Sequence, residues 1–114
     1  MRFLFFIFIE VNFMRHFKKE SDYQKYLIDK IGAMFPGCVI HKNAGYIQGF
    51  PDLTVFFAGG YAMLEVKISR DASHQPNQDW YIEHLNRMSF ARFIYPENEE
   101  EVLNELFRFQ QALK

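Results

Sequence analysis

The sequence predicts a single α/β domain whose mixed β-sheet carries helices on both faces. The length of 114 residues suits one hydrophobic core and is too short for two. An apolar content of 49%, with 18% aromatic residues, argues against disorder over most of the chain. The predicted elements follow the order α-β-β-β-α-β-α, and a hairpin followed by a helical crossover gives both antiparallel and parallel strand pairs.

The first helix is predicted over residues 21–33, which place apolar side chains at helical spacing. Ser21-Asp22-Tyr23-Gln24 can form a capping box at its start. Phe35-Pro36-Gly37 then ends it. The apolar side chains of this helix are Tyr23, Tyr26, Leu27 and Ile31.

Two further helices are predicted in the second half of the chain. One begins near Gln75-Pro76, because proline is tolerated in a first turn. Along one side it carries Trp80, Tyr81, Leu85 and Met88. The last helix starts at Asn98-Glu99-Glu100-Glu101, where a cap and acidic residues favour a helix N-terminus. Its apolar stripe is Val102, Leu103, Leu106 and Phe107.

Four short segments rich in β-branched and aromatic residues are predicted strands. They are residues 38–40, 53–57, 61–67 and 91–95. Ala58-Gly59-Gly60 is typical of a tight hairpin connection between the second and third strands. Asn43-Ala44-Gly45 indicates a turn, and residues 69–74 a polar loop.

The first 13 residues differ from the rest, because Phe3 to Ile9 is an unbroken apolar run. A membrane-spanning helix needs about 20 apolar residues, and no signal-peptide cleavage site follows the run, so we expect no membrane insertion. Two interpretations remain for residues 1–13. They are a strand that joins a sheet and serves as a dimer contact, or a non-native extension ahead of a start at Met14. Either way the predicted domain is residues 14–114.

Cysteine count and charge exclude some functions. A single cysteine, Cys38, excludes an internal disulfide framework and a zinc site built on thiolates. The net charge is −1, but residues 1–70 hold nine Lys/Arg against six Asp/Glu, and residues 71–114 hold four against eight. This asymmetry is compatible with a nucleic-acid face in the first part, and equally with a solvated acidic helix in the second.

Two acids and a lysine interrupt the strand pattern. Asp52 opens one predicted strand, while Glu65 and Lys67 lie two residues apart on the next and so point to the same face. If the two strands pair through the glycine turn, Asp52 and Glu65 converge. Two close carboxylates repel unless a cation lies between them, and oxygen-only ligands favour Mg²⁺ or Mn²⁺. Carboxylates more than about 7 Å apart could not share one cation.

A lysine beside such a metal can orient or deprotonate a water, or offset charge on a phosphate in the transition state. Two carboxylates that bind a cation, with a lysine beside them, are suited to phosphodiester hydrolysis. The alternative from spacing alone is that Glu65 and Lys67 form an exposed ion pair and that Asp52 begins a turn.

Gly49-Phe50-Pro51-Asp52, twelve intervening residues and then Glu65-Val66-Lys67 resemble the G-x-PD … E-x-K signature of the PD-(D/E)xK nucleases. Asn43-Ala44-Gly45 is similar to the N-x-G turn of the VRR-NUC branch of that superfamily. Gln78 resembles the glutamine that follows the motif, and Glu20 the acid of the branch's first helix. The resemblance covers about residues 18–107 and implies a restriction-endonuclease-like mixed sheet flanked by helices.

The resemblance also implies roles for individual residues. Asp52, Glu65 and the carbonyl group of Val66 would be metal ligands, and Glu20 would contribute from the first helix. Lys67 would be the catalytic lysine, and Gln78 would position it or the attacked phosphate, although Gln75 competes for that role. Basic and polar residues near the motif could contact DNA phosphates. These are Lys18, Lys19, His41, Lys42, Asn43, Tyr46 and Arg70.

The function implied is a Mg²⁺-dependent endodeoxyribonuclease, with Mn²⁺ as a possible substitute. Relatives of this size act on branched DNA such as Holliday junctions, in repair, recombination or phage DNA processing, which implies a homodimer. The resemblance further implies a cytoplasmic protein of bacterial or phage origin. The alternative is a catalytically inactive nucleic-acid-binding module on the same fold.

Overall fold

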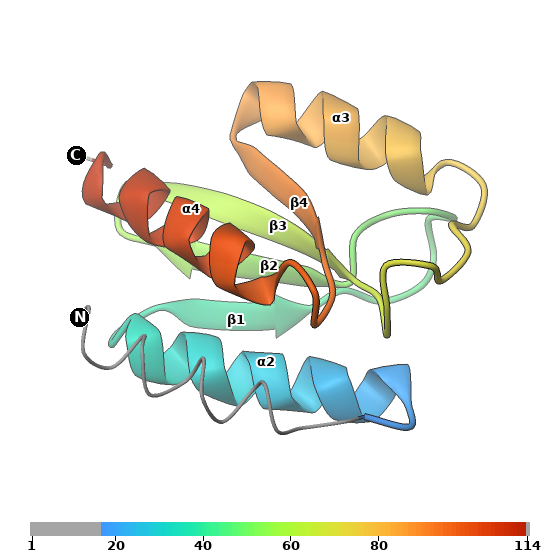
Figure 1. Ribbon diagram of the computed structural model, residues 1–114. Helices are drawn as coiled ribbons and strands as arrows, with labels where there is room; N and C mark the ends of the chain where they lie inside the picture. Colours follow the sequence, from blue (N-terminus) through green and yellow to red (C-terminus); the bar gives the residue numbers. More distant parts are fainter. Residues whose placement is uncertain (1–16, 114) are drawn as a thin grey trace.

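The computed structural model describes residues 17–113, which form one four-stranded sheet with helices on both faces (Figure 1). The elements along the chain are α2 (Glu20–Met34), β1 (Val39–Lys42), β2 (Leu53–Phe57), β3 (Gly60–Val66), α3 (Gln78–Met88), β4 (Phe90–Ile94) and α4 (Glu99–Gln111). The predicted α/β class and the order α-β-β-β-α-β-α are therefore confirmed. The boundary expected between residues 13 and 14 lies outside the described residues.

The sheet has the strand order β1-β2-β3-β4, and its register fixes the candidate site. The first two strand pairs are antiparallel, and β3 runs parallel to β4 because α3 connects them. In the hairpin of β2 and β3, Phe57 pairs with Gly60 and Leu53 with Leu64. One further step in this register places Asp52 opposite Glu65.

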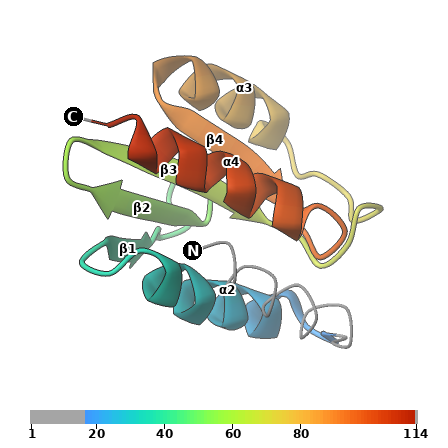
Figure 2. The ribbon, with the colours of Figure 1, turned by 60° about the vertical axis from the view of Figure 1, so that its left-hand side comes forward.

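The two faces of the sheet are covered by different helices (Figures 1 and 2). On one face, α2 and α4 pack through Leu27, Ile31, Leu103 and Leu106, all completely buried. On the other face, α3 covers a smaller cluster of Met63, Leu85 and Ala91. Since α3 lies over β3 and β4, no described helix covers β1 and β2 on this face, and Val39 and Phe56 are 61% and 47% exposed.

The predicted caps at the starts of two helices are wrong in detail. Helix α2 begins one residue before Ser21, with Lys19 at the N-cap position and no side-chain cap. Gln24 is buried and does not fold back onto the backbone as a capping box requires. At α4, Asn98 occupies the N-cap position, but its amide donates to the carbonyl oxygen of Phe93 and accepts from the backbone N–H of Tyr95. Asn98 therefore ties the helix start to β4.

The apolar side predicted for α3 is only partly correct. Leu85 is buried, whereas Trp80 is 57% exposed and Met88 is 63% exposed. A helix packed against two strands buries a narrow stripe, and Tyr81 and Ile82 complete that stripe beside Leu85. Among the described residues, no helix is long and apolar enough to cross a membrane.

Candidate functional site

Three acidic side chains from separate parts of the chain meet at one end of the sheet. Glu20 is the first residue of α2, Asp52 immediately precedes β2, and Glu65 lies near the end of β3. One carboxylate oxygen of each lies within 4.8 Å of the others. Two oxygens that bind one cation at about 2.0–2.6 Å lie at most about 5 Å apart, so the three can share one cation.

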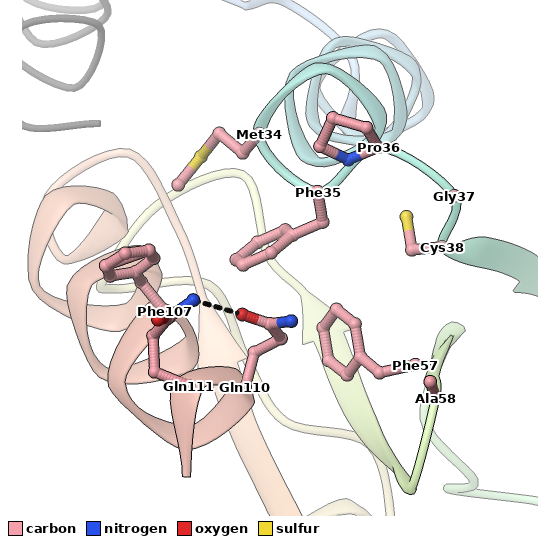
Figure 3. Close-up of a pocket in the computed structure, with 10 residues that line it drawn as sticks. All are labelled: Met34, Phe35, Pro36, Gly37, Cys38, Phe57, Ala58, Phe107, Gln110 and Gln111. Atoms are coloured by element: carbon pink, nitrogen blue, oxygen red, sulfur yellow. Dashed lines mark hydrogen bonds between the residues drawn. The ribbon is translucent and has the colours of Figure 1, made fainter. Parts of the chain in front are cut away.

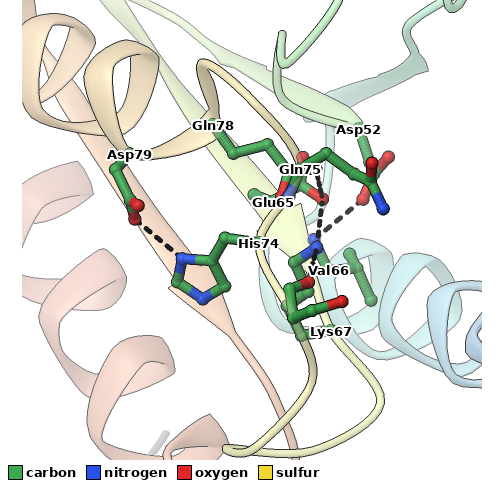
Figure 4. A network of polar contacts seen from close by, with 9 residues as sticks. Asp52, Glu65, Val66, Lys67, His74, Gln75, Gln78 and Asp79 are labelled. Atoms are coloured by element: carbon green, nitrogen blue, oxygen red, sulfur yellow. Dashed lines mark hydrogen bonds and ion pairs between the residues drawn. The ribbon is translucent and has the colours of Figure 1, made fainter.

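Asp52 is held by the loop before it and by the neighbouring strand. The backbone N–H of Asn43 donates to the carbonyl oxygen of Asp52 (2.8 Å), and the Asn43 side-chain amide donates to that of Pro51 (2.9 Å). The backbone N–H of Val66 donates to Asp52 Oδ2 (2.9 Å). These bonds leave the Asp52 carboxylate beside the end of β3 (Figure 4).

The side chain of Glu65 is buried, and only one of its two carboxylate oxygens accepts a hydrogen bond from the described residues. Its Oε2 accepts a hydrogen bond from Gln78 Nε2 (3.0 Å) and lies 3.8 Å from Lys67 Nζ. Its Oε1 has no hydrogen-bond partner among the described residues, although the side chain is only 2% exposed. Burial raises the pKa of Glu65 to about 8, the negative charge of Asp52 adds to the rise, and Lys67 opposes it. A side-chain hydrogen bond with Asp52, which the protonated Glu65 can form, raises the pKa further.

Glu20 is the third acid of the cluster and comes from helix α2 rather than from the sheet. Its pKa is raised by partial burial and by Asp52, and is lowered by Lys67 and by a backbone hydrogen bond at Ile68. Burial is thus the main cause of the raised pKa of both Glu65 and Glu20, and the neighbouring carboxylate charge adds to it. A divalent cation would oppose both shifts.

The loop between β3 and α3 fixes both Lys67 and Gln78 (Figure 4). Lys67 Nζ donates to the carbonyl oxygen of Ser73 (3.0 Å), and the Lys67 side chain is buried. Gln78 Oε1 accepts from the backbone N–H of Gln75 (2.8 Å) while its Nε2 holds Glu65. The structure therefore places Gln78 against Glu65 rather than against Lys67, and Gln75 contributes through its backbone alone.

The expected third metal ligand, the carbonyl of Val66, lies on the correct strand edge. The N–H and C=O of one strand residue face the same edge, and the Val66 N–H faces Asp52. Lys67, the next residue, turns its N–H to the opposite edge and donates to Ile94 (2.9 Å). Coordination by Val66 stays a prediction.

The residues expected to contact DNA are mostly free to do so. Exposed side chains among them are Lys18, Lys19, His41, Lys42, Tyr46 and Arg70. Asn43 differs, because its amide also hydrogen-bonds Thr54 Oγ1 (3.0 Å) and so serves the loop that holds Asp52. Contacts from the exposed residues to phosphate stay predictions.

His74 also belongs to this region, although it was not among the predicted site residues. Its ring stacks on Phe93 at a centroid distance of 4.1 Å, and its Nδ1 lies 2.7 Å from Asp79 Oδ1. Phe93 is the register partner of Glu65 on β4, so His74 anchors the loop that carries Ser73 and Gln75. Nothing in the sequence pattern distinguishes this histidine from an ordinary surface residue.

A cavity of about 430 Å³ lies at the other end of β2 (Figure 3). Its lining includes Phe35, Cys38, Phe57 and Phe107, together with the Gln110 side chain. It contains no acidic group and is remote from the carboxylate cluster. This cavity therefore has no part in the carboxylate cluster, which lies at the end of the sheet where β2 starts and β3 ends.

No protein-family model, curated protein or solved structure was found to match the chain. Function is therefore inferred from the geometry of the carboxylate cluster and from the motif resemblance.

Proposed function

We propose that the chain is a Mg²⁺-dependent endodeoxyribonuclease, with Mn²⁺ able to replace Mg²⁺. The observation that carries the proposal is the bare, buried Oε1 of Glu65 within a cluster of three carboxylates. A buried acceptor without a partner costs about 1–3 kcal/mol, and more if it is charged, so a bound cation fits this position. A set of carboxylate oxygens without sulfur or imidazole is the ligand set of Mg²⁺ and Mn²⁺.

Each residue of the cluster would then have a defined task. Asp52, Glu65 and Glu20 would hold the cation, which supplies Lewis acidity toward the phosphate and acidifies a water. Gln78 fixes the rotamer of Glu65 by hydrogen bonding its Oε2. Lys67, positioned by the Ser73 carbonyl, would place an ammonium group beside the phosphate and offset its developing negative charge.

DNA is the proposed substrate because a phosphodiester suits this chemistry and exposed basic side chains lie on the elements that border the cluster. Lys18 and Lys19 precede α2, Lys42 ends β1, and Arg70 follows β3. Such side chains supply sequence-independent phosphate affinity. Action on branched DNA by a homodimer is a further part of the proposal and is supported by the family resemblance.

Cleavage assays test the proposal directly. We expect wild-type protein to cut supercoiled or four-way-junction DNA with Mg²⁺ or Mn²⁺ and to be inactive in EDTA. Glu65→Gln and Lys67→Met should each lower the rate by at least about 100-fold, because each removes a group that interacts with the transition state. Glu83→Gln, which changes an acid that is 76% exposed on α3, should leave the rate unchanged.

Cleavage that persists in both site variants would identify a contaminating nuclease and refute the assignment. DNA binding without cleavage under every metal condition would instead favour the inactive binding module.

A further inference from the structure

Trp80 is the only tryptophan in the chain, and the fold does not bury it. It lies in the first turn of α3, which packs against the sheet through Leu85, Ile82 and Tyr81. Burying a tryptophan removes about 150–250 Å² of surface from water, yet this side chain is 57% exposed. The core therefore does not account for Trp80.

A row of touching rings connects Trp80 with the loop that precedes Asp52. Phe50, two residues before Asp52, packs edge-on against Tyr81 (5.4 Å), and Tyr81 packs edge-on against Trp80 (5.0 Å). His84 then stacks parallel to the indole, at 4.7 Å and 10°. The loop that carries Phe50 also touches the turn before α3, since Gly49 lies against Pro76 and Asn77. The exposed indole is thus two ring contacts from Phe50, which lies two residues before Asp52.

The charges beside Trp80 do not exclude a nucleic-acid strand. Two acids flank it on α3; Asp79 contacts a histidine ring, and Glu83 contacts an arginine. Asp79 Oδ1 lies 2.7 Å from His74 Nδ1, and Glu83 Oε1 lies 3.8 Å from Arg87. The indole is therefore not surrounded by unpartnered acids, and Gln78, two residues before it on α3, hydrogen-bonds Glu65 of the cluster.

We propose that Trp80 stacks on an unpaired nucleobase of the DNA strand bound at the carboxylate cluster. The substrate class is then DNA with unpaired bases beside the cleaved bond, as in a single strand, a flap or an open branch point. Every base has a π-face that stacks on an aromatic side chain, whereas bases inside a duplex are stacked on each other and are inaccessible. This inference rests on the proposed function, which supplies the bound strand.

The single tryptophan makes the inference measurable without catalysis. Wild-type protein in EDTA is titrated with an eight-nucleotide thymidine strand while tryptophan fluorescence is recorded. The controls are an abasic strand with the same number of phosphates and a blunt duplex. We expect the thymidine strand to change the fluorescence and the two controls to leave it nearly unchanged.

Fluorescence polarisation with labelled strands then tests the side chain. Trp80→Ala should bind the thymidine strand about 5–150-fold more weakly, equivalent to one lost base stack, and should bind the abasic strand as wild type does. Trp80→Phe should retain most of the affinity. Met88→Ala is the matched control, because it removes another apolar side chain of the same helix that is 63% exposed.

Equal fluorescence changes with abasic and thymidine strands, or unchanged affinity of Trp80→Ala, would overturn the inference. A signal that varies with protein concentration and not with DNA would also overturn it and assign Trp80 to a contact between two copies. Base-dependent quenching by a protein that never cleaves DNA would support the stacking site and refute the nuclease. DNA cleavage by the wild type, together with unchanged DNA affinity of Trp80→Ala, would support the nuclease and refute the stacking site.

Discussion

The surroundings of Glu65 disfavour the ionised form of its carboxyl group. Its carboxyl group is buried, Oε1 accepts no hydrogen bond from residues 17–113, and carboxylate oxygens of Asp52 and Glu20 lie within 4.8 Å. Gln78 and Lys67 compensate only one oxygen, since both approach Oε2. The metal-free protein therefore holds a proton on Glu65 more tightly than the unfolded chain does.

This difference predicts a pH-dependent stability in EDTA. The pKa of Glu65 is raised from 4.5 to about 8, so the unfolded chain releases the proton first. Its contribution to the free energy of unfolding is present at low pH, falls as pH rises from about 4.5 to about 8, and is constant above that. Glu65→Gln should remove this decline and stabilise the protein at pH 8 by an amount on the order of a few kcal/mol. Urea denaturation across this pH range measures both curves.

Excess Mg²⁺ should raise the stability of the wild type at pH 8, because a ligand that binds only the folded state stabilises it. It should not stabilise Glu65→Gln to the same extent. If the free energy of unfolding in EDTA depends on pH in the same way for wild type and Glu65→Gln, the pKa of Glu65 is not raised in the folded protein.

At the level of elements, the site depends on contact between two connections. The loop from β1 to β2 holds Asp52, and the loop from β3 to α3 holds Lys67 and Gln78. They meet where Gly49, at φ 87°, packs against Asn77, at φ 73°. Both residues adopt the left-handed conformation, which lets the two backbones approach closely.

Gly49→Ala should destabilise the fold by about 1–3 kcal/mol, because alanine is strained at positive φ and its Cβ has no room. A Cβ at this position would lie 2.6 Å from the carbonyl oxygen of Pro76 and 2.8 Å from Asn77. Gly45→Ala is the matched control, since a Cβ there meets nothing within 4 Å. Thermal denaturation of both variants measures the difference, and equal midpoints would refute the close contact.

Over the whole molecule, a buried polar network joins the two helices that cover one face of the sheet. Lys30 on α2 forms an ion pair with Glu99 at the start of α4, and both side chains are at most 3% exposed. Tyr23 also donates to Glu99 Oε1 (2.8 Å). Burial lowers the pKa of Lys30, and Glu99 opposes that change, so the two charges depend on each other.

Removing either partner should be costly because the other charge stays buried. Lys30→Met and Glu99→Gln should each lower the free energy of unfolding by about 3–5 kcal/mol, measured by urea denaturation. The double variant should recover part of this loss. Glu105→Gln, which breaks a half-exposed pair with Arg92, serves as the control and should cost less than about 1 kcal/mol. Simple additivity of the two single losses would show that Lys30 and Glu99 do not interact.

Periodicity and turn residues in the sequence determined the types and order of the seven elements, because side-chain spacing records local backbone geometry. Counting from the glycine turn also predicted that Asp52 and Glu65 face each other, since hairpin register is local. The motif resemblance predicted that Glu20 and Gln78 belong to the site, but the tertiary structure decided which contacts the distant side chains make. Glu20 arrives from the far end of α2, Gln78 binds Glu65 rather than Lys67, and Ser73 holds the lysine.

The exposure of Trp80 and the contact between Lys30 and Glu99 could not be predicted from local sequence patterns either. The sequence marks a side chain as apolar or charged, but only the placement of α3 over β3 and β4 leaves the indole exposed. Likewise, only the packing of α2 beside α4 brings a lysine and a glutamate 69 residues apart into one buried contact. Local patterns specify the elements, whereas the contacts between layers depend on how all of them pack around one core.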